Sequence, residues 1–376
     1  MHKYFSSKRY ENSVERIEKA YDFEIDDFRE VPLVIQANSY WLTGHDPKEI
    51  PGDYFENPQS MLDFQEEGNR RHIDNIDDDY IPYLMPWYGV ALIPGVFGSE
   101  VFFPKDIDPS CTAFGIKELE DIDRLEIPDF EKNELSIRVL DTIRYFRKNG
   151  EFPITITDPQ GTLDSVALMV GYKNLFYWMN DHPGKIDRLF DVVNRSLIEW
   201  VKTQKKHSGE KIDKCNGAIN VTLPKGLGVW WADDDAVILS PDMYEKFVIG
   251  HYKNLFGSFG GGMIHWCGNA NHQLSSILAT PEIKAVHNYM LGNVDDAKVL
   301  QEKTSKAKVC LAVGDIIPVE DELEDYLKEI KKKLDPRGLI LQFTVSPKLG
   351  IKNGQYTETT RDVMESSLRI IDFFRG

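Results

Sequence analysis

The sequence predicts an α/β fold, a (β/α)8 barrel in which eight parallel strands alternate with helices. Three observations indicate this fold: short apolar runs recur along the chain, amphipathic helical stretches separate them, and polar residues follow several of the runs. A doubly wound open sheet would show the same alternation and is the alternative. In a barrel the chemistry lies at the carboxyl ends of the strands, so the polar strand ends are the first site candidates.

The first third of the chain carries two of the expected strands. Residues 1–30 are charged and helical in character, and we expect an N-terminal extension that wraps the outside of the barrel. The runs at 31–38 (VPLVIQAN) and 80–87 (YIPYLMPW) indicate the first and second strands, the second made irregular by its prolines. Between them, Asn57 is the expected N-cap of a helix with Pro58 at its first position. A long insertion after the second strand covers roughly residues 88–132.

Six further strands are expected in the rest of the chain, with helices between them. They are predicted at 152–161, 227–235, 262–268, 283–290, 307–315 and 338–346. The clearest helix precedes the fourth strand, because apolar residues recur there on one helical face: Ile186, Leu189, Phe190, Val193, Leu197, Trp200 and Val201. Ser240 and Pro241 begin another helix after the fourth strand. We expect one domain that spans residues 1–376.

The composition is that of an ordinary globular chain with an acidic surface. Hydrophobic residues make up 41% of the 376 residues, and 61 acidic against 44 basic side chains give a net charge of −17. Such a surface repels phosphate backbones, so nucleic acid is not an expected partner. The sequence shows neither a signal peptide nor an apolar stretch of membrane-spanning length, so no membrane association is expected. The four cysteines lack CxxC spacing, which argues for a reducing, cytoplasmic location.

The fifth expected strand ends in the run His265-Trp266-Cys267-Gly268. Residues two apart in a strand face the same way, so His265 and Cys267 point together. If they face the barrel axis, an imidazole and a thiolate converge near its mouth, a ligand pair suited to zinc. A buried strand with a hydrogen-bonded histidine and an inert cysteine would show the same spacing. The spacing alone leaves both interpretations open.

The segment around this run resembles a known family. It carries aspartates at a strand end (ADDD, 232–235), an S-P-x-x-Y helix start (SPDMY, 240–244) and a glycine-rich approach to H-x-C-G-N (HWCGN, 265–269). This order is similar to the uroporphyrinogen decarboxylase superfamily, and within it to the corrinoid-dependent methyltransferases, over roughly residues 150–350. The resemblance implies a zinc site with His265 and Cys267 as two ligands. It also implies a small-molecule methyl donor or acceptor and a separate small corrinoid protein that carries the methyl group on cobalamin.

The sequence departs from the family pattern in two places. Thiol-using methyltransferases supply a third ligand from a cysteine in a G-C-G after the last strand, where this chain reads FTVSPKLG (343–350). The third ligand is therefore open, with Asp315, Asp158 or a water as candidates, and an O- or N-methyl donor is favoured over a thiol acceptor. The decarboxylases carry an arginine-rich loop after the first strand and an aspartate after the second, and residues 37–46 and 85–89 contain neither. A metal-free decarboxylase of a small carboxylate and a non-catalytic barrel that binds a corrinoid protein are the alternatives.

The other strand ends supply the remaining candidate residues. Asp233 and Asp234 are the expected catalytic residues, as acids that orient His265, because a metal-bound imidazole usually donates its other N–H to a carboxylate or carbonyl. Both could instead cap the helix that follows. Trp231 and its neighbour Trp230 face opposite ways, so at most one of them lines a pocket. The residues expected to bind substrate are Trp87, Tyr88, Asp158, Trp231, His287 and Asp315.

Overall fold

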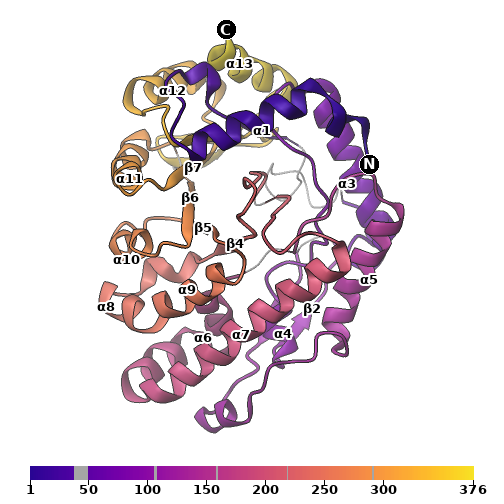
Figure 1. The fold of residues 1–376 in the computed structure, drawn as a ribbon, viewed down its shortest axis with the longest axis vertical. Helices are drawn as coiled ribbons and strands as arrows, with labels where there is room; N and C mark the ends of the chain where they lie inside the picture. The colour runs from indigo at the N-terminus through magenta and orange to yellow at the C-terminus, as the bar shows by residue number, and fades with distance from the viewer. Residues whose placement is uncertain (38–49, 106–107, 158–159, 218, 290–291) are drawn as a thin grey trace.

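A computed structural model describes residues 1–37, 50–105, 108–157, 160–217, 219–289 and 292–376. In these residues six parallel strands form the central sheet, in the order β1-β8-β7-β6-β5-β4, and helices lie outside it (Figure 1). The strands are β1 (Leu33–Gln36), β4 (Val229–Ala232), β5 (Gly262–Trp266), β6 (Ile283–Tyr289), β7 (Cys310–Ile316) and β8 (Leu339–Thr344). The predicted α/β barrel class is confirmed, with each of these strands lying within one residue of its expected range.

Two extended segments occupy the places of the second and third expected strands. Leu84 and Ile154 form an isolated parallel bridge, and Gln160 pairs in the same way with Ala232 of β4. On the far side, the backbone N–H of Asp79 donates to the carbonyl of Leu33 in β1 at 2.7 Å. Full strands were wrongly predicted at 80–87 and 152–161, because their prolines lack the N–H that a ladder needs. Between β4 and β1 the described part of the ring therefore continues through two isolated bridges and one backbone hydrogen bond instead of ladders.

The outer layer consists of helices that alternate with the strands as expected. They are α1 (Lys8–Tyr21), α3 (Pro58–Asn75), α4 (Leu92–Val96), α5 (Glu134–Asn149), α6 (Thr162–Asp181), α7 (Pro183–Ser208), α8 (Pro241–Tyr244), α9 (Gly250–Gly257), α10 (Leu274–Leu278), α11 (Val294–Ala307), α12 (Glu320–Lys333) and α13 (Val363–Arg375). Shorter turns are η1 (Lys3–Ser6), η2 (Phe28–Glu30), η4 (Leu119–Arg124), η5 (Asp234–Ile238) and the π-helical η6 (Glu245–Ile249), which joins α8 to α9. The expected caps are confirmed, since the Asn57 and Ser240 side chains accept backbone N–H groups of α3 and α8. Among the described helices, none is long and apolar enough to cross a membrane.

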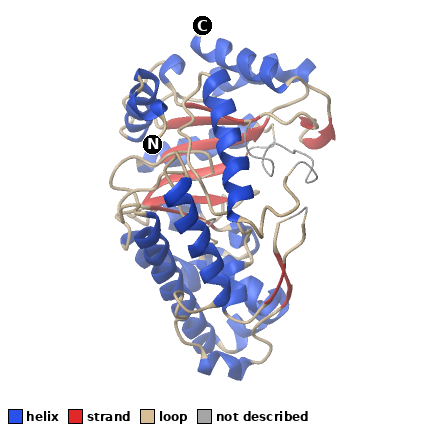
Figure 2. Cartoon of the chain, turned by 90° about the vertical axis from the view of Figure 1, so that its right-hand side faces the viewer, coloured by secondary structure: helices blue, strands red, loops and turns tan. Residues whose placement is uncertain are grey.

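Two β-hairpins project from the ring on the same side of the molecule (Figure 2). The insertion after the second segment forms the first hairpin, from β2 (Glu100–Phe102) and β3 (Ser110–Ala113). The second hairpin follows β8 and consists of β9 (Leu349–Lys352) and β10 (Gln355–Glu358). This second hairpin thus begins within residues 343–350, the stretch whose sequence left the third ligand open.

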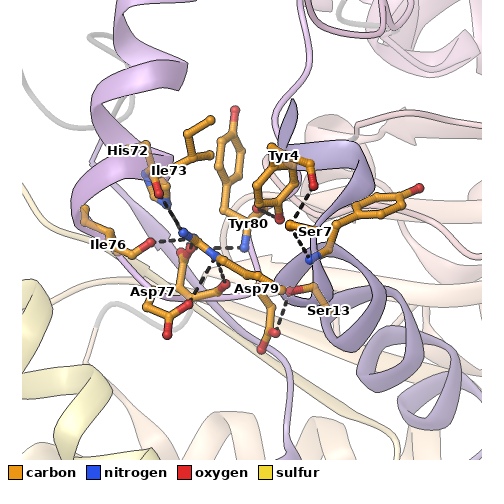
Figure 3. Close-up of polar contacts among 12 residues, drawn as sticks. Tyr4, Ser7, Ser13, His72, Ile73, Ile76, Asp77, Asp79 and Tyr80 are labelled. Atoms are coloured by element: carbon orange, nitrogen blue, oxygen red, sulfur yellow. Dashed lines mark hydrogen bonds and ion pairs between the residues drawn. The ribbon is translucent and has the colours of Figure 1, made fainter. Parts of the chain in front are cut away.

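The N-terminal extension is fastened beside β1 by buried carboxylates (Figure 3). Arg9 of α1 lies 3.1 Å from the buried Asp78, and the buried Asp79 accepts a hydrogen bond from Ser13. The same carboxylates accept backbone hydrogen bonds from β1: the N–H of Leu33 donates to Asp79 at 2.9 Å, and the N–H of Ile35 donates to Asp78 at 2.7 Å. Side chains therefore replace part of the strand partner that β1 lacks on this edge.

The chain that leads from α7 into β4 enters the middle of the ring (Figure 1). Asn220 exchanges two hydrogen bonds with the hydroxyl of Tyr83, at 3.0 and 3.1 Å. Gln36, the last residue of β1, donates to the carbonyl of Ile219 at 3.3 Å, and Thr155 donates to that of Gly217 at 2.9 Å. We call residues 209–228 the inner loop. It contacts β1 and the two extended segments that carry the Leu84–Ile154 bridge.

Candidate metal centre

The candidate site lies at the carboxyl end of β5. In the sheet His265 is the register partner of Ala232 on β4 and of His287 on β6, so these residues share one face. That face is the inside of the ring, because His287 on β6 reaches Gln342 on β8 across the intervening β7. His265 therefore points toward the barrel axis, as the metal interpretation of the sequence required.

Three potential ligands converge there. The Nε2 atom of His265 is 3.5 Å from Sγ of Cys267 and 3.8 Å from Oδ1 of Asp234. The three ligand atoms all lie within 4.8 Å of one another. His265 and Cys267 lie side by side, as their spacing predicted. Asp234, which was expected to orient His265, lies on the same side as Cys267 and is a third candidate ligand.

This donor set fits zinc. Bonds of about 2.0–2.1 Å to nitrogen or oxygen and 2.3 Å to sulfur, in tetrahedral geometry, keep neighbouring ligand atoms roughly 3.4–3.6 Å apart. The two separations from His265, 3.5 and 3.8 Å, are close to that range, and the third, between Cys267 and Asp234, is at most 4.8 Å. His265 is buried whereas Cys267 is exposed, so the group opens on the side of the thiol. Three protein ligands with one open side are the usual arrangement of a catalytic zinc site.

Backbone contacts fix the loop that carries Cys267. The backbone N–H of Cys267 donates to Oδ1 of Asp234 at 2.7 Å. The side chain of Asn288, at the end of β6, donates to the carbonyls of Trp266 and Gly268 at 2.8 and 3.0 Å. Gly268 has a φ of 79°, which a side chain would strain, so the glycine after the cysteine permits the turn. The thiol is therefore held beside the histidine before any ligand binds.

The position of Asp234 depends on another buried acid. Asp164 of α6 accepts the backbone N–H groups of Asp234 and Asp235 at 3.0 and 2.9 Å, which anchors the start of η5. Burial, and then the charge of Asp233, raises the pKa of Asp164. Burial also raises the pKa of Asp234 itself. A cation between Asp234 and Cys267 would offset this clustering of negative charge.

Asp233 has a different environment from Asp234. Its carboxylate is fully buried and accepts a hydrogen bond from the hydroxyl of Tyr244, while its backbone N–H donates to the carbonyl of His265 at 2.8 Å. Burial raises the pKa of Asp233 to about 7. These contacts direct the side chain toward the helical layer, so of the two expected catalytic aspartates only Asp234 faces the imidazole.

The second nitrogen of His265 contacts a histidine instead of an acid. Nδ1 of His265 is 2.8 Å from Nδ1 of His287 and 3.3 Å from the His287 carbonyl oxygen. Nε2 of His287 is 3.0 Å from Oε1 of Gln342. Burial lowers the pKa of His265 to about 4 and also lowers that of His287, so both rings are neutral near pH 7. The orienting position assigned to an aspartate from the sequence is thus filled by His287.

Two aromatic candidates for substrate binding make other contacts. The indole N–H of Trp87 donates to Asp108 of the insertion at 2.7 Å. The hydroxyl of Tyr88 lies 2.8 Å from that of Thr142 on α5. These contacts turn both side chains toward the insertion and the outer helices.

Trp231 and Asp315 lie on the outer face of the sheet. Trp231 is the register partner of Ile264, the neighbour of His265, and therefore points away from the ring interior. Asp315 accepts hydrogen bonds from Tyr326 of α12 at 2.5 Å and from the backbone of Gly292 at 2.8 Å, which makes it unsuitable as the third ligand. Asp158 lies outside the described residues, so His287 is the one substrate candidate that the described part of the chain brings to His265.

Other polar residues on the inner face went unnoticed in the sequence. Tyr289 is perpendicular to both histidines, with ring centroids 5.6 Å from His265 and 5.1 Å from His287. The amide oxygen of Gln342 lies 3.0 Å from Nε2 of His287, and the hydroxyl of Thr344 donates to the side chain of Gln36. All of them occupy alternate positions of otherwise apolar strands, in the runs HNY, QFT and VIQ. That alternation is the signal that identifies an inward-facing polar set once the strands are known.

Comparison with known proteins agrees with this architecture. A family model described as uroporphyrinogen decarboxylase (URO-D) matches residues 84–323. The structure of a methyltransferase from Methanosarcina mazei superposes with a TM-score of 0.68, covering 97% of this chain and 99% of that chain, at 15% sequence identity. No curated protein matches the sequence. At this identity the structural likeness shows the fold.

Proposed function

Because the chain belongs to the uroporphyrinogen decarboxylase family, we propose that it is a zinc-dependent methyltransferase. It moves a methyl group between a small molecule and the cobalamin of a small corrinoid protein. The observation that carries the proposal is the convergence of His265, Cys267 and Asp234 at the open end of the ring. A methyltransferase of the same fold supports it.

Each ligand candidate has a separate part in the proposed site. Zinc, when bound, would supply Lewis acidity to the heteroatom that exchanges the methyl group. His265 offers a buried nitrogen, Cys267 an exposed thiolate, and Asp234 a carboxylate already oriented by the Cys267 N–H. Bond cleavage between the heteroatom and the methyl carbon leaves the electron pair on the heteroatom, so a site that stabilises negative charge there favours transfer.

The nature of the third ligand favours an O- or N-methyl donor over a thiol acceptor. A carboxylate is a harder ligand than a thiolate and donates less electron density to a metal. With Asp234 in place of the second cysteine of the thiol-using enzymes, the site is better suited to polarise an ether oxygen or an amine nitrogen. Methoxylated aromatics and methylamines are therefore the favoured classes of donor, and betaines, whose quaternary nitrogen has no lone pair for zinc, are the third class to be tested.

The test combines metal content with turnover. Protein made in zinc-supplemented medium should contain about one zinc per chain by elemental analysis, and Cys267→Ser should lose it while Cys111→Ser, a control at a half-buried thiol of β3, should retain it. Cob(I)alamin, supplied free and on corrinoid partner proteins, should be converted to methylcobalamin by one of the three donor classes.

Two results would reject the proposal. Zinc near zero in both wild type and Cys267→Ser would favour a metal-free decarboxylase of a small carboxylate. Zinc binding without turnover of any donor, and without thiols accepting from methylcobalamin, would favour a non-catalytic barrel that binds a corrinoid protein.

A further inference from the structure

We infer that Gln342 and His287 are positioning residues that set the tautomer of His265. The amide oxygen of Gln342 fixes one proton on His287, and His287 in turn fixes one on Nδ1 of His265. The Nε2 lone pair of His265 is then directed toward Cys267 and Asp234. We call this series of hydrogen bonds from Gln342 through His287 to His265 the relay. Its role rests on the proposed function, because it prepares His265 to bind a metal. The hydrogen bonds themselves involve only side chains of this chain.

The first step is the contact between β8 and β6. Oε1 of Gln342 is 3.0 Å from Nε2 of His287, and an amide oxygen can only accept a hydrogen bond. Nε2 of His287 must therefore carry a hydrogen. Since His287 is fully buried, the doubly protonated and charged ring is disfavoured. The neutral ring has a single N–H, so its Nδ1 holds a lone pair.

The second step is the contact between the two imidazoles. Nδ1 of His287 is 2.8 Å from Nδ1 of His265, a distance that requires one nitrogen to donate and the other to accept. Because Nδ1 of His287 is the acceptor, Nδ1 of His265 is the donor. The carbonyl oxygen of His287, 3.3 Å from the same nitrogen, is a second acceptor and favours the same assignment. Nε2 of His265 is left without a hydrogen, 3.5 Å from the Cys267 sulfur.

The opposite amide orientation would reverse the whole series. An NH2 group of Gln342 facing His287 would donate to its Nε2, and Nδ1 of His287 would then donate to Nδ1 of His265. Nε2 of His265 would carry the hydrogen and could not bind a metal. The orientation of the Gln342 amide therefore decides whether Nε2 of His265 is free to bind a metal, although this amide bonds to His287 and not to His265 itself.

Gly314 of β7 makes room for the relay. It is the register partner of Gln342 on one side and of Tyr289 on the other, so it lies where the relay passes from β6 to β8. A Cβ atom at this position would lie 3.0 Å from Nε2 of His287 and 2.7 Å from the Tyr289 ring. A side chain on β7 would therefore press against the nitrogen that must reach Gln342.

The direct test reads the tautomers in the zinc-free, full-length protein. Long-range ¹H–¹⁵N spectra of protein labelled with ¹⁵N-histidine distinguish Nδ1–H from Nε2–H rings. His265→Gln and His287→Gln variants identify the signals by their loss. We expect hydrogen on Nδ1 of His265 and on Nε2 of His287. Hydrogen on Nε2 of His265 in the wild type would overturn the inference.

A pair of glutamine variants tests the origin of the tautomer. Gln342→Met removes the acceptor at similar volume, so His265 should populate both tautomers and zinc affinity should fall on the order of 10–100-fold. Gln301→Met is the control, at a buried glutamine of α11 whose amide bonds to Asp335, and it should change neither readout. If Gln342→Met keeps both the wild-type tautomers and a zinc affinity within about twofold of the control, the relay has no positioning role.

The two hypotheses can fail separately. The tautomers are read without metal and without substrate. A wild type that shows them but binds no zinc would contradict the proposed function and leave the relay supported. A wild type that binds zinc through His265 but carries the opposite apo tautomer would contradict the relay and leave the proposed function supported.

Discussion

The two halves of the ring are stabilised in different ways. From β4 to β8 and on to β1, neighbouring strands form continuous parallel ladders. In the other half, the segments around Leu84 and Ile154 share one isolated bridge and bond to the inner loop, and buried carboxylates bond to the open edge of β1. The ladder half carries His265 and its partners at fixed register, whereas the bridged half depends on individual polar contacts. Substitutions should therefore affect stability most in the bridged half and zinc binding most in the ladder half.

The largest loss of stability is expected at a buried ion pair beside the inner loop. Lys205, at the end of α7, lies 2.6 Å from Glu210 and donates to the carbonyl of Lys214, and both charged side chains are fully buried. Lys205→Met leaves an unpaired buried carboxylate and should lower the free energy of unfolding by about 3–5 kcal/mol. Lys202→Met, one turn earlier in an exposed pair with Glu199, should cost about 1 kcal/mol or less in the same denaturant titration. Equal losses in the two variants would show that the inner loop does not depend on this pair.

The next effect separates binding from stability in the ladder half. Asp234→Asn keeps the shape of the side chain but weakens it as a ligand, so zinc affinity should fall on the order of 10–100-fold or more while the melting temperature stays within a few degrees. Asp235→Asn, at the next residue of η5, provides the control, because its carboxylate accepts from Tyr172 instead of approaching His265. A helix-capping role for Asp234 predicts the reverse, a stability loss of about 1 kcal/mol with unchanged zinc binding.

A pH dependence is expected from the buried acid between the two halves. Burial raises the pKa of Asp233 to about 7, above its unfolded value of about 3.9. The folded state then holds more protons than the unfolded state between these values. Asp233 should therefore lower stability as pH rises through this window, by up to about 1.4 kcal/mol per pH unit. Urea titrations from pH 4 to 7 should show a shallower dependence for Asp233→Asn, and an unchanged slope would contradict this assignment.

The smallest effect is a helix cap outside both halves. The Ser240 hydroxyl accepts the backbone N–H of Met243 at 3.3 Å at the start of α8. Ser240→Ala should cost about 1 kcal/mol of stability and leave zinc affinity unchanged. A change in zinc binding would mean that α8 influences the site more than its contacts imply.

The same contrast explains what could be predicted from the sequence. Periodicity and caps predicted the strands of the ladder half and the helix starts at Asn57 and Ser240, because local patterns determine them. Prolines at 82, 86 and 153 reduced two expected strands to bridges, and local patterns do not reveal the inner loop that compensates for them. Spacing placed His265 and Cys267 on one side. It placed Asp234 behind the histidine instead of beside Cys267, and it did not predict that His287 and Gln342 would contact His265 in series, since these contacts depend on which strands become neighbours in the ring.

The identity of the atoms around bound zinc tests the central claim most directly. X-ray absorption at the zinc edge of the purified protein should show one sulfur at about 2.3 Å and nitrogen or oxygen neighbours at about 2.0–2.1 Å, with the sulfur shell absent in Cys267→Ser and present in Cys111→Ser. A zinc environment without sulfur in the wild type, or a sulfur shell that persists in Cys267→Ser, would contradict a metal centre built from His265, Cys267 and Asp234.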